Sequence, residues 1–350
     1  MRYVVVVIVV VALVLGLITF QHSLQSKLMQ KVIWTVPSGE YGCDVACTSP
    51  DSFAVLTHSK DCSLLREIKC SGAVTSKVIL PGDEIYFIAG ANGRYVAVNQ
   101  SELSALCVDM KSSKVHSLGK GVLFDFGISG NAYPISPYGP YALLAVEKDR
   151  VLRVVNYETG ATERDIAEVE NNLGEYIRWQ QGSNKLIWLD PKTCILHYEK
   201  GSTVAGLSKQ ITETGKMEVV LSPDAKKAAV FPKGQLPGID ISIIDVKTSR
   251  ILTKLHESID NCCIQCVRWS PDSSTIAISL LNSKFQGVPF FYILRAGGKK
   301  TMVSLRNGWC FYGVYSAFDW FDDSKRLVLS AYRNYGKQNA VVLVDMDRHP

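Results

Sequence analysis

A short turn followed by an alternating apolar strand recurs along this chain at a nearly constant spacing. In the stretch RWSPDSSTIAIS, Arg268–Ser279, an apolar strand ends at Trp269 and a second strand follows the Ser-Pro-Asp turn. Related copies begin at positions 49, 90, 136, 180, 222, 270 and 321, which lie 41 to 51 residues apart. A repeat of this length is typical of architectures in which each unit is one small sheet.

Each unit contains four β segments separated by turn residues. The unit around Ser270 reads CIQCVRWS, TIAISLL, VPFFYILRA and KTMVSL, and the unit around Ser222 follows the same order. The segments are rich in Val, Ile, Phe and Tyr, which are enriched in strands, and the turns between them are polar. Seven such units predict an all-β fold, a seven-bladed β-propeller of four-stranded blades.

The seventh unit is one strand short. Its third segment is AVVLVDMDRHP, which ends at Pro350, while KVIWTVP, residues 31–37, precedes the first unit and has no unit of its own. We expect residues 31–37 to form the outer strand of blade seven, so that the first and last segments are hydrogen-bonded together. This closure removes two exposed sheet edges.

The repeated Ser-Pro-Asp turn has a structural explanation. Proline sets the backbone angle that the turn needs, and aspartate accepts main-chain hydrogen bonds within it. Asp51, Asp224 and Asp272 are therefore interpreted as turn formers rather than catalytic acids. The acidic residues Asp319, Asp322 and Asp323 are interpreted as turn and strand-end groups.

The repeats SPDSSTIAI and LSPDAKKAAV resemble those of TolB-type, PD40 or WD40-like propellers, over about Ser49 to Ser330. The resemblance implies the propeller fold. Units two, four and seven lack Ser-Pro-Asp, and the Gly-His and Trp-Asp signature of true WD40 repeats does not occur. The separate N-terminal α/β domain of TolB-like proteins also has no counterpart here, so the partner of that family is not carried over.

The N-terminus is different in character. Residues 3–20, YVVVVIVVVALVLGLITF, contain no charge over 18 positions, and such a helix is about 27 Å long, close to the thickness of a bilayer core. Residues 1–20 are predicted to be a signal anchor, a single transmembrane helix; the alternative is a cleaved signal peptide. Residues 21–30 then form a polar stalk, and residues 31–350 form a propeller on the extracytoplasmic side, periplasmic or extracellular. Arg2 before the segment favours this orientation, whereas Lys27 and Lys31 after it oppose it.

Composition and motifs limit the classes of function. The net charge of +5 is mild, and Lys and Arg form no long run, so the basic footprint of a nucleic-acid-binding protein is not visible. The six histidines form no H-x-x-x-H pair, and neither a G-x-S-x-G elbow nor a glycine-rich phosphate loop occurs. We therefore expect no metal, cofactor or local catalytic motif, and a protein-binding platform or scaffold for another protein or an envelope component. The alternative is a hydrolase-like or lactonase-like enzyme whose single residues converge around the channel from several blades.

Four cysteines are expected on one rim of the ring. Cys43, Cys262, Cys263 and Cys310 each lie where the chain leads into an innermost strand, in blades one, six and seven. One hypothesis is a disulfide cluster that staples the closure region. The others are four unrelated loop cysteines, or a thiolate metal site, for which the sequence offers no accompanying histidine.

An aromatic loop lies beside these cysteines, RNGWCFYGVYSAFDWF, residues 306–321. Aromatic side chains offer large contact area with few rotamers, so a contact patch is one interpretation. The other is that the rings plug the channel or cover the core. The candidate binding rim comprises Trp309, Phe311, Tyr312, Tyr315, Tyr41 and Arg306.

Overall fold

The structure is a computed structural model of the chain. The residues that it describes form 27 strands. It describes residues 29–347 except the following positions: 48, 81–84, 92–93, 100–103, 121–134, 137, 147–150, 167–176, 181, 190–194, 200–216, 233–237, 260–261, 283–287, 312–317 and 335.

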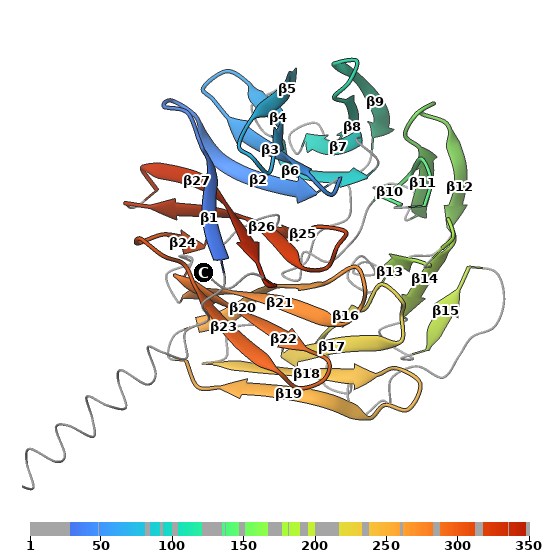
Figure 1. Cartoon of the computed structure of the whole chain (residues 1–350). Coiled ribbons are helices and arrows are strands. Elements are labelled where there is room, and N and C mark those ends of the chain that lie inside the picture. The colour runs from blue at the N-terminus through green and yellow to red at the C-terminus, as the bar shows by residue number, and fades with distance from the viewer. Residues whose placement is uncertain are drawn as a thin grey trace, which may run out of the picture.

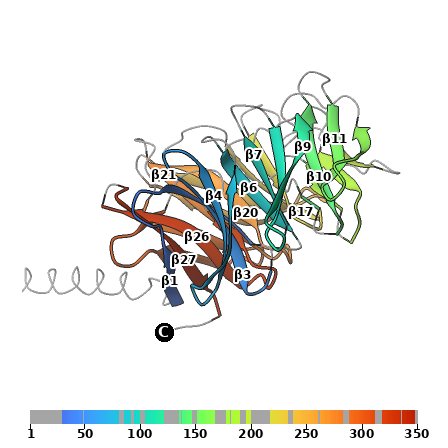
Figure 2. The same ribbon diagram turned by 90° about the horizontal axis from the view of Figure 1, so that it is seen from above.

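Seven antiparallel sheets follow one another around a ring, which confirms the seven-bladed propeller (Figure 1). Seen from above, the sheets of blades seven, one, two and three stand side by side in that order (Figure 2). Blade one comprises β2 (Tyr41–Cys47), β3 (Ser52–His58), β4 (Ser63–Lys69) and β5 (Val74–Leu80). Blade two comprises β6 (Ile85–Ala91), β7 (Arg94–Asn99), β8 (Ser104–Asp109) and β9 (Lys114–Lys120).

Blades three and four each show three described strands, where four were expected. Blade three comprises β10 (Tyr141–Val146), β11 (Val151–Asn156) and β12 (Thr162–Ile166). Blade four comprises β13 (Ile177–Trp179), β14 (Leu186–Leu189) and β15 (Leu196–Tyr198). An isolated bridge from Ile135 to Ala142 lies where the innermost strand of blade three was expected. The outer segment expected in blade four falls outside the described residues.

Blades five and six are four-stranded, as predicted. Blade five comprises β16 (Met217–Leu221), β17 (Lys227–Pro232), β18 (Ile239–Asp245) and β19 (Ile251–Glu257). Blade six comprises β20 (Cys262–Trp269), β21 (Thr275–Asn282), β22 (Phe290–Arg295) and β23 (Lys300–Ser304).

Blade seven joins the two ends of the described chain. It comprises β24 (Cys310–Phe311), β25 (Phe318–Trp320), β26 (Arg326–Arg333), β27 (Gln338–Asp345) and β1 (Met29–Thr35). β1 pairs antiparallel with β27, from Met29 opposite Asp345 to Thr35 opposite Ala340. The segment at residues 31–37 thus corresponds to β1, which is the outer strand of this sheet.

Side chains of β1 also reach the two neighbouring blades. Gln30 donates from Nε2 to the carbonyl of Ser304 at 2.7 Å, at the end of blade six. Ile33 packs in a core cluster shared by blades seven and one. Gly72 of blade one has φ +93°, and a Cβ there would lie 2.4 Å from the Ile33 carbonyl oxygen. The closure strand is therefore in contact with three blades.

The Ser-Pro-Asp turns have the predicted structural role. Ser270 donates from Oγ to Asp272 Oδ1 at 2.6 Å, and Thr275 N donates back to Ser270 Oγ at 3.0 Å. Ser222 and Asp224 make the same 2.6 Å bond in blade five. Because these groups satisfy the turn itself, the interpretation of Asp224 and Asp272 as turn formers is confirmed.

Neighbouring blades are joined by repeated indole hydrogen bonds. Trp269 Nε1 donates to the carbonyl of Val220 at 2.9 Å, from blade six to blade five. Trp320 Nε1 donates to the carbonyl of Arg268 at 3.2 Å, from blade seven to blade six. A tryptophan at the end of an innermost strand thus satisfies a buried carbonyl of the preceding blade.

In the described part of the chain, no helix is long and apolar enough to cross a membrane. The expected anchor at residues 1–20 and most of the expected stalk at 21–30 lie outside that part.

The packing of β1 predicts different effects for two adjacent residues. Ile33→Ala removes a side chain that is 8% exposed and should lower the free energy of unfolding by about 2–4 kcal/mol. Val32→Ala is the matched control, because Val32 is 40% exposed and should lose only about 0.5 kcal/mol. Urea denaturation of the full chain measures both, and equal losses would contradict burial of β1 against blade one.

Candidate functional site

The ring has two ends that differ in what they present. The turn end carries the Ser-Pro-Asp turns, at the ends of the innermost strands. The loop end is where the innermost strands begin, and it contains the candidate binding rim. At the loop end, Gly238 N of blade five donates to the carbonyl of Cys262 at 3.2 Å, and Phe311 N of blade seven donates to that of Val288 at 2.9 Å. At the loop end, the loop between the second and third strands of one blade therefore contacts the beginning of the innermost strand of the next blade.

Two of the predicted rim aromatics belong to the core. Trp309 is 5% exposed and Phe311 is 1% exposed, and both pack in a cluster with residues of blades six and seven. The Phe311 ring centroid lies 5.9 Å from that of Phe291 and 5.6 Å from that of Phe318. The contact-patch interpretation is therefore wrong for these two side chains, which cover the core instead.

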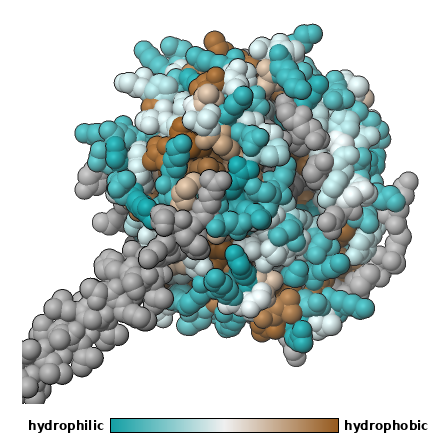
Figure 3. All heavy atoms as spheres, viewed as in Figure 1, coloured by the Kyte–Doolittle hydropathy of each residue, from teal (hydrophilic) through white to brown (hydrophobic). Residues whose placement is uncertain are grey.

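The other rim residues are placed differently. Tyr41 is 55% exposed, and its ring centroid lies 5.8 Å from that of His58. Arg306 is exposed at the end of blade six. Tyr312 and Tyr315 lie outside the described residues. On the face shown in Figure 3, apolar side chains form separate small groups among polar ones.

The expected cysteine cluster shows no disulfide among its described side chains. Cys262, Cys263 and Cys310 are free thiols, and burial raises the pKa of each above its ordinary value. The side chain of Cys43 lies outside the described residues. Pairing of Cys43 in the oxidised protein stays a prediction. Among the described residues, no group of three potential metal ligands is brought together.

The channel contains an ion pair that sequence reasoning did not find. Arg268 of β20 lies 3.1 Å from Asp319 of β25, between Nη1 and Oδ1. Asp319 Oδ2 also accepts from the main-chain N of Cys47, in β2, at 2.9 Å. One carboxylate thus joins the innermost strands of blades six, seven and one. The interpretation of Asp319 as a turn or strand-end group is replaced by this inter-blade role.

The electrostatics of this carboxylate are dominated by burial. Burial raises the pKa of Asp319, and the nearby Arg268 guanidinium only partly offsets that effect. Arg178 of blade four occupies the equivalent position before a tryptophan and donates from Nε to the Leu221 carbonyl at 3.0 Å. One sequence signal could have identified these inter-blade charged residues. A charged residue directly precedes the tryptophan of an innermost strand in Arg178-Trp179, Arg268-Trp269 and Asp319-Trp320.

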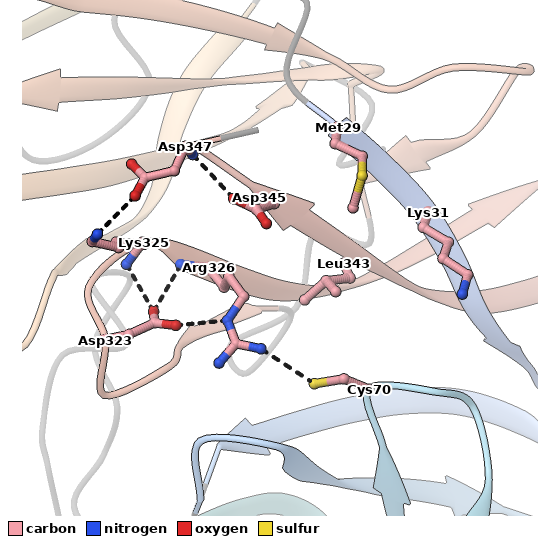
Figure 4. A pocket seen from close by; sticks show the side chains of 9 residues that line it. All are labelled: Met29, Lys31, Cys70, Asp323, Lys325, Arg326, Leu343, Asp345 and Asp347. Carbon is pink, nitrogen blue, oxygen red and sulfur yellow. Dashed lines mark hydrogen bonds and ion pairs between the residues drawn. The ribbon is translucent and has the colours of Figure 1, made fainter. Parts of the chain in front are cut away.

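A pocket of about 420 Å³ lies beside β1 at the turn end, between blades seven and one (Figure 4). Arg326 donates from Nε to Asp323 Oδ2 at 2.6 Å, and its Nη1 lies 3.8 Å from Cys70 Sγ. Lys325 pairs with Asp347 at 2.8 Å. Arg326 and Lys325 are thus both paired with carboxylates in the lining of the pocket. We interpret the pocket as part of the polar contact between blades seven and one.

Comparison with known proteins identifies the fold. No protein-family model matches the chain, and no curated protein sequence matches it. The β-propeller domain of Myceliophteria thermophila Cps50 (Swd1) is similar, with TM-score 0.54 and 12% identity over 89% of this chain and 99% of that one. The WD40 domain of Toxoplasma gondii coronin is also similar, with TM-score 0.55 and 9% identity over 92% of this chain and 87% of that one. These similarities establish a WD40-like propeller fold.

The ion pair predicts that the stability of the folded protein depends strongly on Arg268, the cation beside the buried Asp319 carboxylate. Arg268→Met leaves the Asp319 carboxylate buried without its cation and should destabilise the protein by about 3–5 kcal/mol at pH 7. Arg268→Met/Asp319→Asn should recover most of the loss. Because the carboxyl pKa is raised in the folded state, the folded chain takes up a proton before the unfolded chain, so the single variant should gain stability as pH falls from 7 to 5.

Lys254→Met provides the control for that experiment. Its pair with Asp240 is exposed, at 53% and 42% of the two side chains, and should contribute about 0.5 kcal/mol or less. Urea denaturation at several pH values measures all the variants. A loss in Arg268→Met no larger than in the control would contradict the inter-blade role of Asp319.

Proposed function

We propose that this protein is a binding platform, a propeller held at a membrane by its N-terminal segment, that recognises another protein or an envelope component through its loop end. The observation that carries the proposal is that the Asp319 carboxylate makes contacts between blades. Its carboxylate is occupied by Arg268 and by the main chain of Cys47. We assign this acid the structural role of joining blades, and we look for recognition at the rim loops.

The outer edges of the blades support recognition through the rim. An unpaired strand edge can accept a strand from another protein, and a lysine on that edge opposes such pairing. Five of the six described outer strands carry a lysine, namely Lys31 in β1, Lys77 in β5, Lys114 in β9, Lys254 in β19 and Lys300 in β23, and the sixth, β12, carries Arg164. Strand addition at the perimeter is therefore disfavoured.

The membrane part of the proposal rests on residues 3–20. Their 18 uncharged positions match the length of a bilayer-spanning helix. Only eight residues, 21–28, separate this segment from β1. The proposed anchor would therefore attach directly to the closure strand, with the propeller on the extracytoplasmic side.

Fractionation tests the anchor. The full chain should remain in the membrane pellet after alkaline carbonate extraction, whereas Val9→Asp/Val10→Asp, which places two charges in the apolar segment, should shift to the soluble fraction. Protease added to cells from which any outer membrane has been removed should degrade the propeller. Full-length protein in the soluble fraction would contradict the anchor, and a propeller protected until the membrane is opened would contradict the orientation.

Photo-crosslinking tests the platform. A benzophenone amino acid in place of Tyr41, which is 55% exposed at the loop end, should give a discrete adduct with a partner in native membranes. The same amino acid in place of Ile251, which is 56% exposed on the outer strand β19, should not. Identical adducts at both positions, or none at Tyr41, would count against recognition through the loop end.

A further inference from the structure

The positive charge of the chain is concentrated in its last two blades. Residues 262–347, from the start of blade six to the last described residue, contain ten Lys or Arg and six Asp, a net charge of +4 out of the +5 of the whole chain. The remaining residues therefore have a net charge of +1. Charge asymmetry of this kind indicates a surface for an anionic partner.

Most of these ten cations are accounted for elsewhere. Four are paired with carboxylates: Arg268 with Asp319, Lys300 with Glu257, Lys325 with Asp347, and Arg326 with Asp323. Arg295 and Lys299 belong to the turn between β22 and β23, at the turn end, and Lys284 lies outside the described residues. Three remain at the loop end of blade seven, and we name them the basic turn cluster: Arg306, Arg333 and Lys337.

Two adjoining turns hold the basic turn cluster together around Trp309. The guanidinium carbon of Arg333 lies 4.6 Å from the Trp309 ring centroid. Trp309 N donates to the carbonyl of Arg306 at 3.3 Å, which closes the first turn. Lys337 N donates to the carbonyl of Asn334, also at 3.3 Å, which closes the second turn. Arg306 thus lies in the turn that leads to Trp309, while Arg333, at the end of β26, stacks on Trp309 directly before the turn that contains Lys337.

Arg333 is held in place, and the cluster keeps its charge uncompensated. Arg333 stacks on Trp309 and donates from Nε to Gln338 Oε1, so its side chain is restrained before any partner binds. Arg306 and Lys337 are exposed. None of the three forms an ion pair with a described residue. A restrained, unpaired guanidinium loses less rotamer freedom when it binds a carboxylate.

We propose that the basic turn cluster binds an acidic segment of a partner protein. The proposal deepens the proposed function, on which it rests, by naming the chemistry of the partner. Basic clusters that recognise anionic lipid surfaces typically contain about four to eight Lys or Arg, more than the three found here. Trp309 is 5% exposed and cannot enter a bilayer as an interfacial anchor. One restrained guanidinium and two exposed cations fit a short run of carboxylates better.

A peptide-binding assay tests the proposal directly. Full-length protein in neutral detergent is titrated into a rhodamine-labelled peptide of alternating Glu and Gly, and fluorescence anisotropy is measured at low and high salt. Binding should weaken with salt, and Arg306→Gln/Arg333→Gln/Lys337→Gln should weaken it by about tenfold or more at low salt. Thermal unfolding checks that the triple variant is folded. If it is not folded, the single variant Lys337→Gln, which changes a residue in an exposed turn, replaces it in the binding assay.

A second triple variant separates the cluster from net charge. Lys185→Gln/Lys226→Gln/Lys247→Gln removes the same charge from exposed turns of blades four and five and should change the affinity by less than about twofold. Equal weakening by both triple variants would overturn the proposal. So would the absence of peptide binding, or cluster-dependent binding to phosphatidylserine vesicles without peptide binding. None of these outcomes depends on the anchor, so the fractionation result can stand or fail separately.

Discussion

The pairing of β1 with β27 is the constraint on which the rest of the ring depends. Blade seven is built from both ends of the described chain, so its sheet can be completed only when residues 29–35 return to residues 338–345. Gln30 extends this contact to blade six, and Ile33 extends it to blade one. Release of β1 would uncover the edge of β27 and an apolar cluster together. The closure is therefore a cooperative contact among three blades, and it is also the point from which the proposed anchor would hold the protein.

Polar groups in the interior of the ring join blades. Asp319 spans three innermost strands, and the indoles of Trp269 and Trp320 each satisfy a carbonyl of the preceding blade. A buried charge is tolerated when its hydrogen bonds are made by fixed partners, and removal of a single partner is then costly. The proposed recognition would occur at the loop end, where Tyr41 is exposed and where blade seven carries cations without a described ion pair.

The repeat architecture was predictable from sequence because its signals are local. The turn at Ser270 and its counterparts fix the period, and the seven sheets follow from it. The burial of Trp309 and Phe311 was not predictable, because aromatic density in a connecting loop does not show which side faces the core. The pair of Arg268 with Asp319 joins residues 51 positions apart, and only their common place before a tryptophan hinted at it. Likewise, the position of the four cysteines on one rim does not determine whether any two of them have the Cβ separation that a disulfide needs.

Hydrogen–deuterium exchange of the closure strand tests the central claim most directly. Peptides covering residues 29–35 and 338–345 would be followed by mass spectrometry, with β5 and β19, the outer strands of complete blades, as references. If β1 closes the ring, its amides should be protected as strongly as those of β5 and β19, and should lose protection together with β27 as denaturant is added. Rapid exchange of residues 29–35 while residues 338–345 stay protected would show that the ring holds without β1, and would contradict the closure.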